Sequence, residues 1–212
     1  LFLDTDKARH ISATGAIDFS KAMPTVDLKV GMQDFQVNAF SPLGEDVLSS
    51  IRGMASGNFN LKGLLQNPEM NGELTLKNAG LQFPYLNVDY NLAEGATIGL
   101  DGQSFNFQNI GLKDIKYETE GLLNGSITHK NFDDWFLDLQ LSSENLLVLD
   151  TQDSEEALYY GTGFIKGNAS ISGLTQAITI DVNAKTMPKT LFVIPLKDIA
   201  LLNIFFAQDL SK

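Results

Sequence analysis

The dominant pattern along the chain is alternation of apolar and polar residues with a period of two. From Ile11 to Phe19, apolar or small residues occupy every second position, and polar residues occupy most of the positions between them. Period-two alternation is typical of half-buried β-strands. Because the same pattern returns as far as Ala184, the sequence predicts an all-β fold.

The alternation changes phase at several points without a turn between the two segments. The apolar face of residues 26–32 continues from Phe35 one position out of phase. One extra residue in a strand produces such a slip, so we expect a β-bulge near Gln33 and Asp34.

A loose unit of strand, turn and strand recurs between residues 11 and 184. Its clearest copy is "GNFNLKGLLQNPEMNGELTL", residues 57–76. The pattern predicts a corner at Asn67–Pro68. The three glycines of this copy, Gly57, Gly63 and Gly72, are expected at strand ends or where strands approach closely.

Two segments break the strand pattern and predict one or two short helices. The first covers residues 45–55, where apolar residues recur at helical spacing. The second covers residues 197–206, in a terminal segment whose "LLNIFF" is equally prone to form a strand. No apolar run reaches the roughly 18 residues that a membrane-spanning helix needs.

The recurring unit favours a long meandering sheet over separate compact modules. We find no boundary in composition, so we expect one domain over residues 1–212. With 43% hydrophobic residues the chain is an ordinary folded protein. An apolar sheet face of this size must be covered, so the sheet closes on itself, pairs with a second sheet, or bends into a trough.

Charge and residue types exclude several function classes. The net charge of −11 makes nucleic acid a poor partner, and the absence of cysteine excludes thiolate chemistry. We expect His10 and His129 to be exposed or at a sheet edge. The acidic stretch 150–157 is predicted to be a solvated loop. It lacks the glycine that a calcium-binding loop needs, so we do not expect it to bind calcium. We therefore predict no catalytic residue, metal or cofactor, and no enzyme activity.

Several stretches resemble the TamB-like proteins of the AsmA/TamB superfamily. The unit at 57–76 resembles their strand-corner-strand repeat. The stretch "YYGTGFIKGNASISG", followed by "ITIDVNAKT" and "VIPL", resembles the conserved C-terminal domain of TamB. The stretch "GSITHKNFDDWFLDLQLSSENLLVLDT" fits the same domain, so the resemblance covers residues 50–196.

The resemblance implies a bent, taco-like sheet in the periplasm of a diderm bacterium. It implies a longer parent protein, anchored in the inner membrane and reaching the outer membrane, of which this chain is a fragment. The implied partners are phospholipids and an outer-membrane barrel of the TamA type. The implied function is a lipid conduit between the two membranes, with a role in outer-membrane protein assembly and secretion.

Two readings of the apolar face stay open. Alternation alone favours an ordinary closed core, whereas the resemblance favours a groove for acyl chains. A scaffold that binds nascent outer-membrane strands through open sheet edges is the alternative function. The residues predicted to line a lipid groove are Leu61, Leu74, Leu76, Val88, Leu100, Phe105, Phe107, Ile127, Trp135, Leu137, Leu139, Leu141, Ile171, Ile178, Ile180 and Val182.

Overall fold

The computed structural model describes residues 2–5, 8–20, 22–38, 49–130, 134–154 and 157–195. The strands are β1 (Phe2–Thr5), β2 (Ala8–Asp18), β3 (Thr25–Gln36), β4 (Ser49–Leu64), β5 (Asn67–Phe83), β6 (Val88–Leu92), β7 (Thr97–Gly102), β8 (Ser104–Asp114), β9 (Glu120–Lys130), β10 (Asp134–Thr151), β11 (Tyr160–Leu174), β12 (Ala177–Thr186) and β13 (Leu191–Val193). A short 3-10 helix, η2 (Pro84–Leu86), follows β5. In the described residues no helix is long and apolar enough to cross a bilayer.

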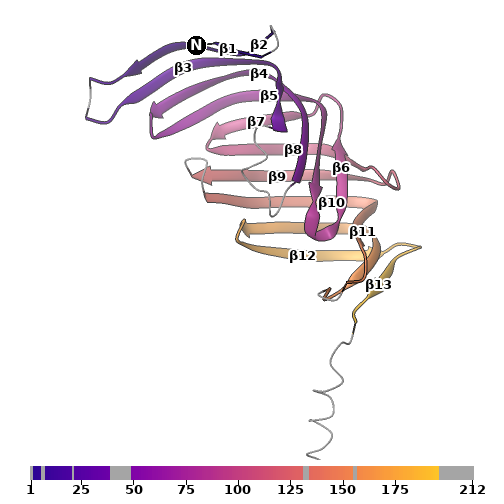
Figure 1. Cartoon of the computed structure of the whole chain (residues 1–212). Helices are drawn as coiled ribbons and strands as arrows, with labels where there is room; N and C mark the ends of the chain where they lie inside the picture. The colour runs from indigo at the N-terminus through magenta and orange to yellow at the C-terminus, as the bar shows by residue number, and fades with distance from the viewer. Residues whose placement is uncertain are drawn as a thin grey trace, which may run out of the picture.

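All thirteen strands belong to one sheet, and the predicted all-β meander is confirmed. The strands stack in chain order from β1 to β12, each antiparallel to its neighbour (Figure 1). The order branches twice: β6 and β7 both lie between β5 and β8, and β13 pairs with β11 beside β12.

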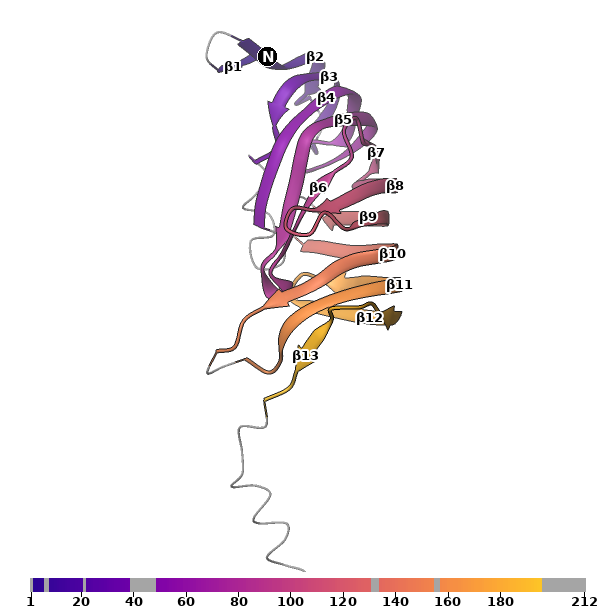
Figure 2. The same cartoon turned by 90° about the vertical axis from the view of Figure 1, so that its right-hand side faces the viewer.

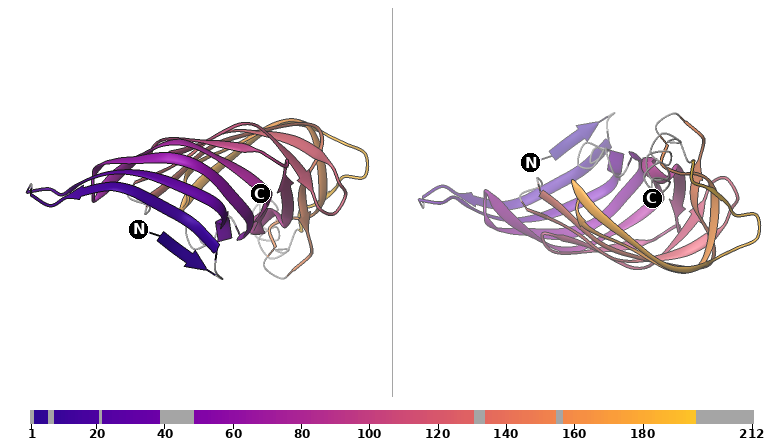
Figure 3. Two further views of the ribbon diagram at one scale, coloured as in Figure 1. Left: turned by 90° about the horizontal axis from the view of Figure 1, so that it is seen from above. Right: turned by 90° about the horizontal axis from the view of Figure 1, so that it is seen from below.

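The sheet bends across its long strands and forms a trough. Figures 2 and 3 show β4, β5, β10 and β11 curving toward one concave side. We call the part of the sheet that contains β7 and β12 the long wall, and the part that contains β6 and β13 the short wall. Each long strand passes from one wall into the other.

Several of the register shifts lie where the strands pass between the walls. In β8 the pairing shifts between Phe107 and Ile110, and in β10 it shifts between Ser142 and Asn145. Bulges bend a strand and increase its twist, which explains the fold line of the trough. The predicted bulge near Gln33 and Asp34 is confirmed, because the β3–β4 register shifts between Met32 and Phe35.

Directly paired residues share a face of the sheet, so the register traces the inner face from strand to strand. One row crosses the sheet through Ile11, Met32, Gly57, Leu74, Ile98, Phe107, Gly125, Leu139, Ile171 and Ile180. The residues beside this row on the other face, such as Glu73 and Asp138, are exposed. The inner face is therefore apolar, and the outer face is largely polar.

Glycines allow the backbones of neighbouring strands to approach closely at positions in the inner rows. Gly125 has a φ of 114°, and a Cβ there would lie 2.0 Å from the carbonyl oxygen of Asp138. Gly57 and Gly72 lie inside β4 and β5, so placing them at strand ends was wrong. Their expected close approach is confirmed, since a Cβ on Gly57 would lie 2.2 Å from the carbonyl oxygen of Glu73.

The helix predicted over residues 45–55 is wrong from Ser49 onward, where β4 begins. The β4–β5 register shifts twice in this segment, between Ser49 and Arg52 and again between Arg52 and Met54. Each shift lengthens the interval between inward-facing residues, which imitates helical spacing. Residues 45–48 and the second predicted helix, 197–206, lie outside the described residues.

The predicted corner at Asn67–Pro68 is displaced by two residues. Leu65 and Gln66 form the turn, and Asn67 and Pro68 already belong to β5. Pro68 precedes the segment of β5 that pairs with β7, which begins at Met70. A proline is tolerated there because that edge of β5 needs no N–H donor.

Candidate functional site

The inner face of the trough contains an apolar cavity of about 200 Å³. Residues of the long wall and of the short wall both line this cavity. The lining residues are Val37, Ile51, Arg52, Ala55, Leu74, Leu76, Ala79, Gly80, Leu81, Leu92, Ile98, Phe105, Phe107, Ile127, Trp135, Leu137 and Thr175. Two of these side chains, those of Arg52 and Thr175, are polar.

The Arg52 guanidinium is held by polar groups of the protein. Its Nη2 lies 2.7 Å from a carboxylate oxygen of Asp89 and donates to Oδ1 of Asn91 at 2.6 Å. It also donates to the main-chain oxygen of Tyr90 at 3.2 Å. The charge of Arg52 is thus compensated locally, and the cavity offers an apolar ligand an otherwise apolar surface.

The predicted groove residues fall into three groups. The first lines the cavity: Leu74, Leu76, Phe105, Phe107, Ile127, Trp135 and Leu137. The second packs in or against the core: Leu61, Val88, Leu100, Leu139, Leu141, Ile171 and Ile178. The third, Ile180 and Val182, lies on the edge strand β12 with 44% and 59% of its surface exposed. The structure brings the first group together around one cavity and leaves the third open to solvent.

An aromatic cluster stands beside the cavity on the long wall. The His129 ring lies 5.1 Å from that of Trp135 and 5.8 Å from that of Phe105, measured between centroids. His129 is 3% exposed, so the expectation of an exposed or edge histidine was wrong for this residue. Burial lowers the pKa of His129, which favours the neutral ring at neutral pH. The side chain of His10 lies outside the described part of the structure.

Two polar groups that the sequence did not single out anchor the short wall. The hydroxyl of Tyr90 in β6 donates to the main-chain oxygen of Leu147 in β10 at 2.5 Å. Asp114, at the end of β8, accepts from the main-chain N–H groups of Lys116 and Thr119. An Asp that closes a strand just before a turn is the signal that could have identified Asp114.

Among the described residues, no group of three or more His, Asp or Glu side chains could hold a metal ion. Asp150 and Thr151 belong to β10, so the solvated loop predicted over 150–157 is wrong at these two positions. Asp150 pairs with Lys116 and accepts from the hydroxyl of Thr162. In the cavity lining Arg52 is the charged residue, and the other lining side chains apart from Thr175 are apolar.

These features define a class of protein: a meandering antiparallel sheet bent into a trough with an apolar interior. The family model described as the TamB C-terminal domain matches residues 2–98 and 108–203, and the chain belongs to this family. Neither the curated proteins nor the solved structures gave a match to the chain.

The family match gives the chain a place in the bacterial envelope. The TamB family acts in outer-membrane protein assembly, together with outer-membrane proteins of the TamA type. The matched residues extend beyond the stretch 50–196 that the sequence motifs covered, and the added part includes β1, β2 and β3.

Proposed function

We propose that the inner face of the trough holds phospholipid acyl chains and guides them between the inner and outer membranes. The observation that carries the proposal is the apolar cavity of about 200 Å³, which borders the apolar rows that cross the sheet. An acyl chain lying along these rows would cross the strands, with its head group at the open side. We further propose that the chain acts as a single unit, because all its described strands share one sheet.

The driving force of such binding is burial of apolar surface. Each methylene removed from water contributes about 0.8 kcal/mol. Because similar inner rows repeat from strand to strand, neighbouring positions along the trough present similar surfaces. A bound acyl chain could therefore move along the trough without being held in a deep free-energy minimum.

The test is lipid extraction from the purified chain, followed by mass spectrometry. The informative variant is Ile127→Glu, which places a charge in the cavity lining of β9. The matched control is Phe136→Glu on the neighbouring strand, where the side chain is 45% exposed. We expect Phe136→Glu to retain its phospholipid. Ile127→Glu should contain about tenfold less phospholipid, because a carboxylate is poorly solvated beside acyl chains.

Circular dichroism and thermal unfolding establish that both variants fold. Equal lipid content in two folded variants would contradict the conduit, as would a folded wild-type protein without lipid.

The open edge of β12 favours a second candidate function, a scaffold for nascent outer-membrane strands. In the described part of the chain, β11 is the only strand that pairs with β12, so the other edge of residues Ala177–Thr186 is free. An extended peptide could add to this edge through main-chain hydrogen bonds. Ile180→Lys would place a charge on the edge and should block strand capture.

A further inference from the structure

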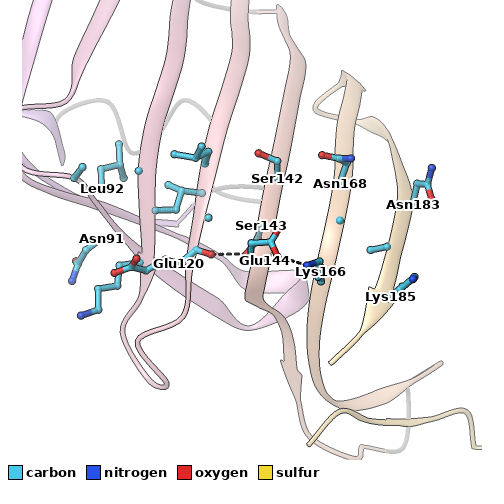
Figure 4. Close-up of a pocket in the computed structure, with 18 residues that line it drawn as sticks. Asn91, Leu92, Glu120, Ser142, Ser143, Glu144, Lys166, Asn168, Asn183 and Lys185 are labelled. Carbon is cyan, nitrogen blue, oxygen red and sulfur yellow. Dashed lines mark hydrogen bonds and ion pairs between the residues drawn. The ribbon is translucent and has the colours of Figure 1, made fainter. Parts of the chain in front are cut away.

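A second depression, of about 1040 Å³, lies on the outer face of the sheet. Figure 4 shows its side chains, which project from β6, β8, β9, β10, β11 and β12. The register places it outside the trough: Leu122, Ser142, Asn168 and Asn183 form one paired row. The next row, which contains Leu141, belongs to the inner face. We call this depression the outer groove.

The outer groove runs across the strands, and polar groups repeat along its floor. Ser142, Asn168 and Asn183 come from three successive strands and pair directly in register. Neighbouring strands lie about 4.8 Å apart, so these groups repeat at that interval. Within the described residues the side-chain amides of Asn168 and Asn183 make no hydrogen bond, and both residues are exposed. They are available to a ligand.

Charged side chains line the groove in a pattern that departs from the rest of the molecule. The lining contains three lysines, Lys113, Lys166 and Lys185, and two glutamates, Glu120 and Glu144, whereas the whole chain carries a net charge of −11. Lys113 pairs with Glu118, which does not line the groove. Lys166 pairs with Glu144, but both side chains are more than half exposed, so this pair contributes little to stability and can rearrange. The groove thus tolerates negatively charged groups on a ligand.

The groove also has an apolar contact surface. Leu122 is 44% exposed although it lies on the largely polar face of β9. The stems of the lysines add methylene groups to the same surface. A ligand matched to this groove is extended, carries many hydroxyl or amide groups, and has an apolar side.

We propose that the outer groove binds an extended β-1,4-linked amino-sugar chain that crosses β8 to β12. The sugars of such a chain repeat at a spacing close to that of the strands, so successive residues meet Ser142, Asn168 and Asn183 in turn. Sugar hydroxyls and acetamido groups donate and accept, as side-chain amides do. The C–H face of a ring packs on Leu122, and acidic substituents face the lysines. The bacterial envelope contains a polymer of this chemistry in its cell wall.

The polar row Ser142, Asn168 and Asn183 lies on the face of the sheet opposite the trough, although Leu92 lines both the outer groove and the apolar cavity. A protein that reaches across the envelope would gain a lateral contact with the wall while its interior stays free. We therefore expect substitutions of Asn168 and Asn183 to leave lipid binding unchanged.

The experiment uses the purified chain with two probes: insoluble cell-wall sacculi in a co-sedimentation assay, and tetra-N-acetylchitotetraose in a titration followed by NMR. The informative variant is the double substitution Asn168→Ala/Asn183→Ala. The matched control is Asn60→Ala/Asn71→Ala, a directly paired and exposed asparagine pair on the outer face of β4 and β5, away from the groove.

Wild type and the control should bind both probes, and the groove variant should bind about tenfold more weakly because two hydrogen-bonding side chains are lost. Circular dichroism verifies that all three proteins fold. Absence of wild-type binding overturns the proposal, and so does an equal effect of the two double substitutions. Displacement of sacculi by an extended polypeptide, but not by the oligosaccharide, would assign the groove to a protein strand and would also overturn it.

Discussion

The centre and the C-terminal end of the trough share one sequence pattern but differ sharply in burial. Leu139 and Ile171, which pair directly, are 3% and 4% exposed. Ile180 pairs with Ile171 in the same row and is 44% exposed. One step across the sheet, to an edge strand, accounts for the change. Alternation therefore identifies which face a residue occupies, whereas the number of neighbouring strands decides how deeply it is buried.

The largest expected difference in stability comes from shortening one inner-face side chain at the centre of the trough and one at its C-terminal end. Leu139→Ala should lower the free energy of unfolding by about 2–5 kcal/mol, since it opens a cavity in the covered centre. Val182→Ala, at the edge, should cost less than about 1 kcal/mol. Urea unfolding followed by the fluorescence of Trp135, the one tryptophan in the chain, measures both. Similar losses would mean that the end of the trough is covered in solution.

A smaller effect is expected at two glycines that share a backbone conformation. Gly125 and Gly173 both have a φ of 114°. A Cβ on Gly125 would lie 2.0 Å from the Asp138 oxygen in β10, which is held between two strands. A Cβ on Gly173 would lie 2.5 Å from the Ala177 oxygen, at the start of the edge strand β12.

Since the edge strand can move away, Gly125→Ala should destabilise by at least about 1 kcal/mol more than Gly173→Ala, beyond the conformational strain that both share. Thermal unfolding at matched concentrations gives the difference. If Gly173→Ala is the more damaging substitution, β12 is held as rigidly as the central strands.

The smallest effect is expected at the hydrogen bond between β6 and β10. Tyr90→Phe removes the bond to Leu147 and should cost about 1 kcal/mol at neutral pH. Burial, with the charge of Asp114, raises the pKa of Tyr90 above its ordinary value of 10.0. The unfolded chain loses the phenol proton of Tyr90 near pH 10, while the folded chain keeps it. The contribution of Tyr90 to the free energy of unfolding is therefore complete below pH 10 and is lost as the pH rises further.

Urea unfolding between pH 8 and pH 11 should show this loss in the wild type and less of it in Tyr90→Phe. Parallel curves for the two proteins would mean that Tyr90 ionises as easily in the folded state as in the unfolded one.

The sequence predicted the strands and their inner faces well, because period two is a local signal. Leu74, Phe107 and Leu139 were assigned to one face from alternation, and the register places all three in one row. The segment at Ser49–Met54 was misread as a helix because two register shifts there depend on pairing with β5. Such register shifts depend on the partner strand, so they cannot be predicted from the sequence of one segment alone.

The polar groups were harder to predict, because tertiary contacts determine their roles. His129 lies on a strand that reads as polar, and Phe105 and Trp135 bury it from neighbouring strands. Tyr90 and Leu147 are separated by 57 positions in the chain and meet only after the sheet has bent. The cavity lining similarly required the fold line, since residues of both walls contribute to it.

The strand order described above has a consequence for how the molecule is made. Strands pair with neighbours that precede or follow them closely in the chain, so few contacts require a distant segment to return. Folding can then advance by adding one hairpin at a time to a finished edge, as in repeat proteins. A chain of this kind can assemble progressively from one end, and each completed strand serves as the template for the next.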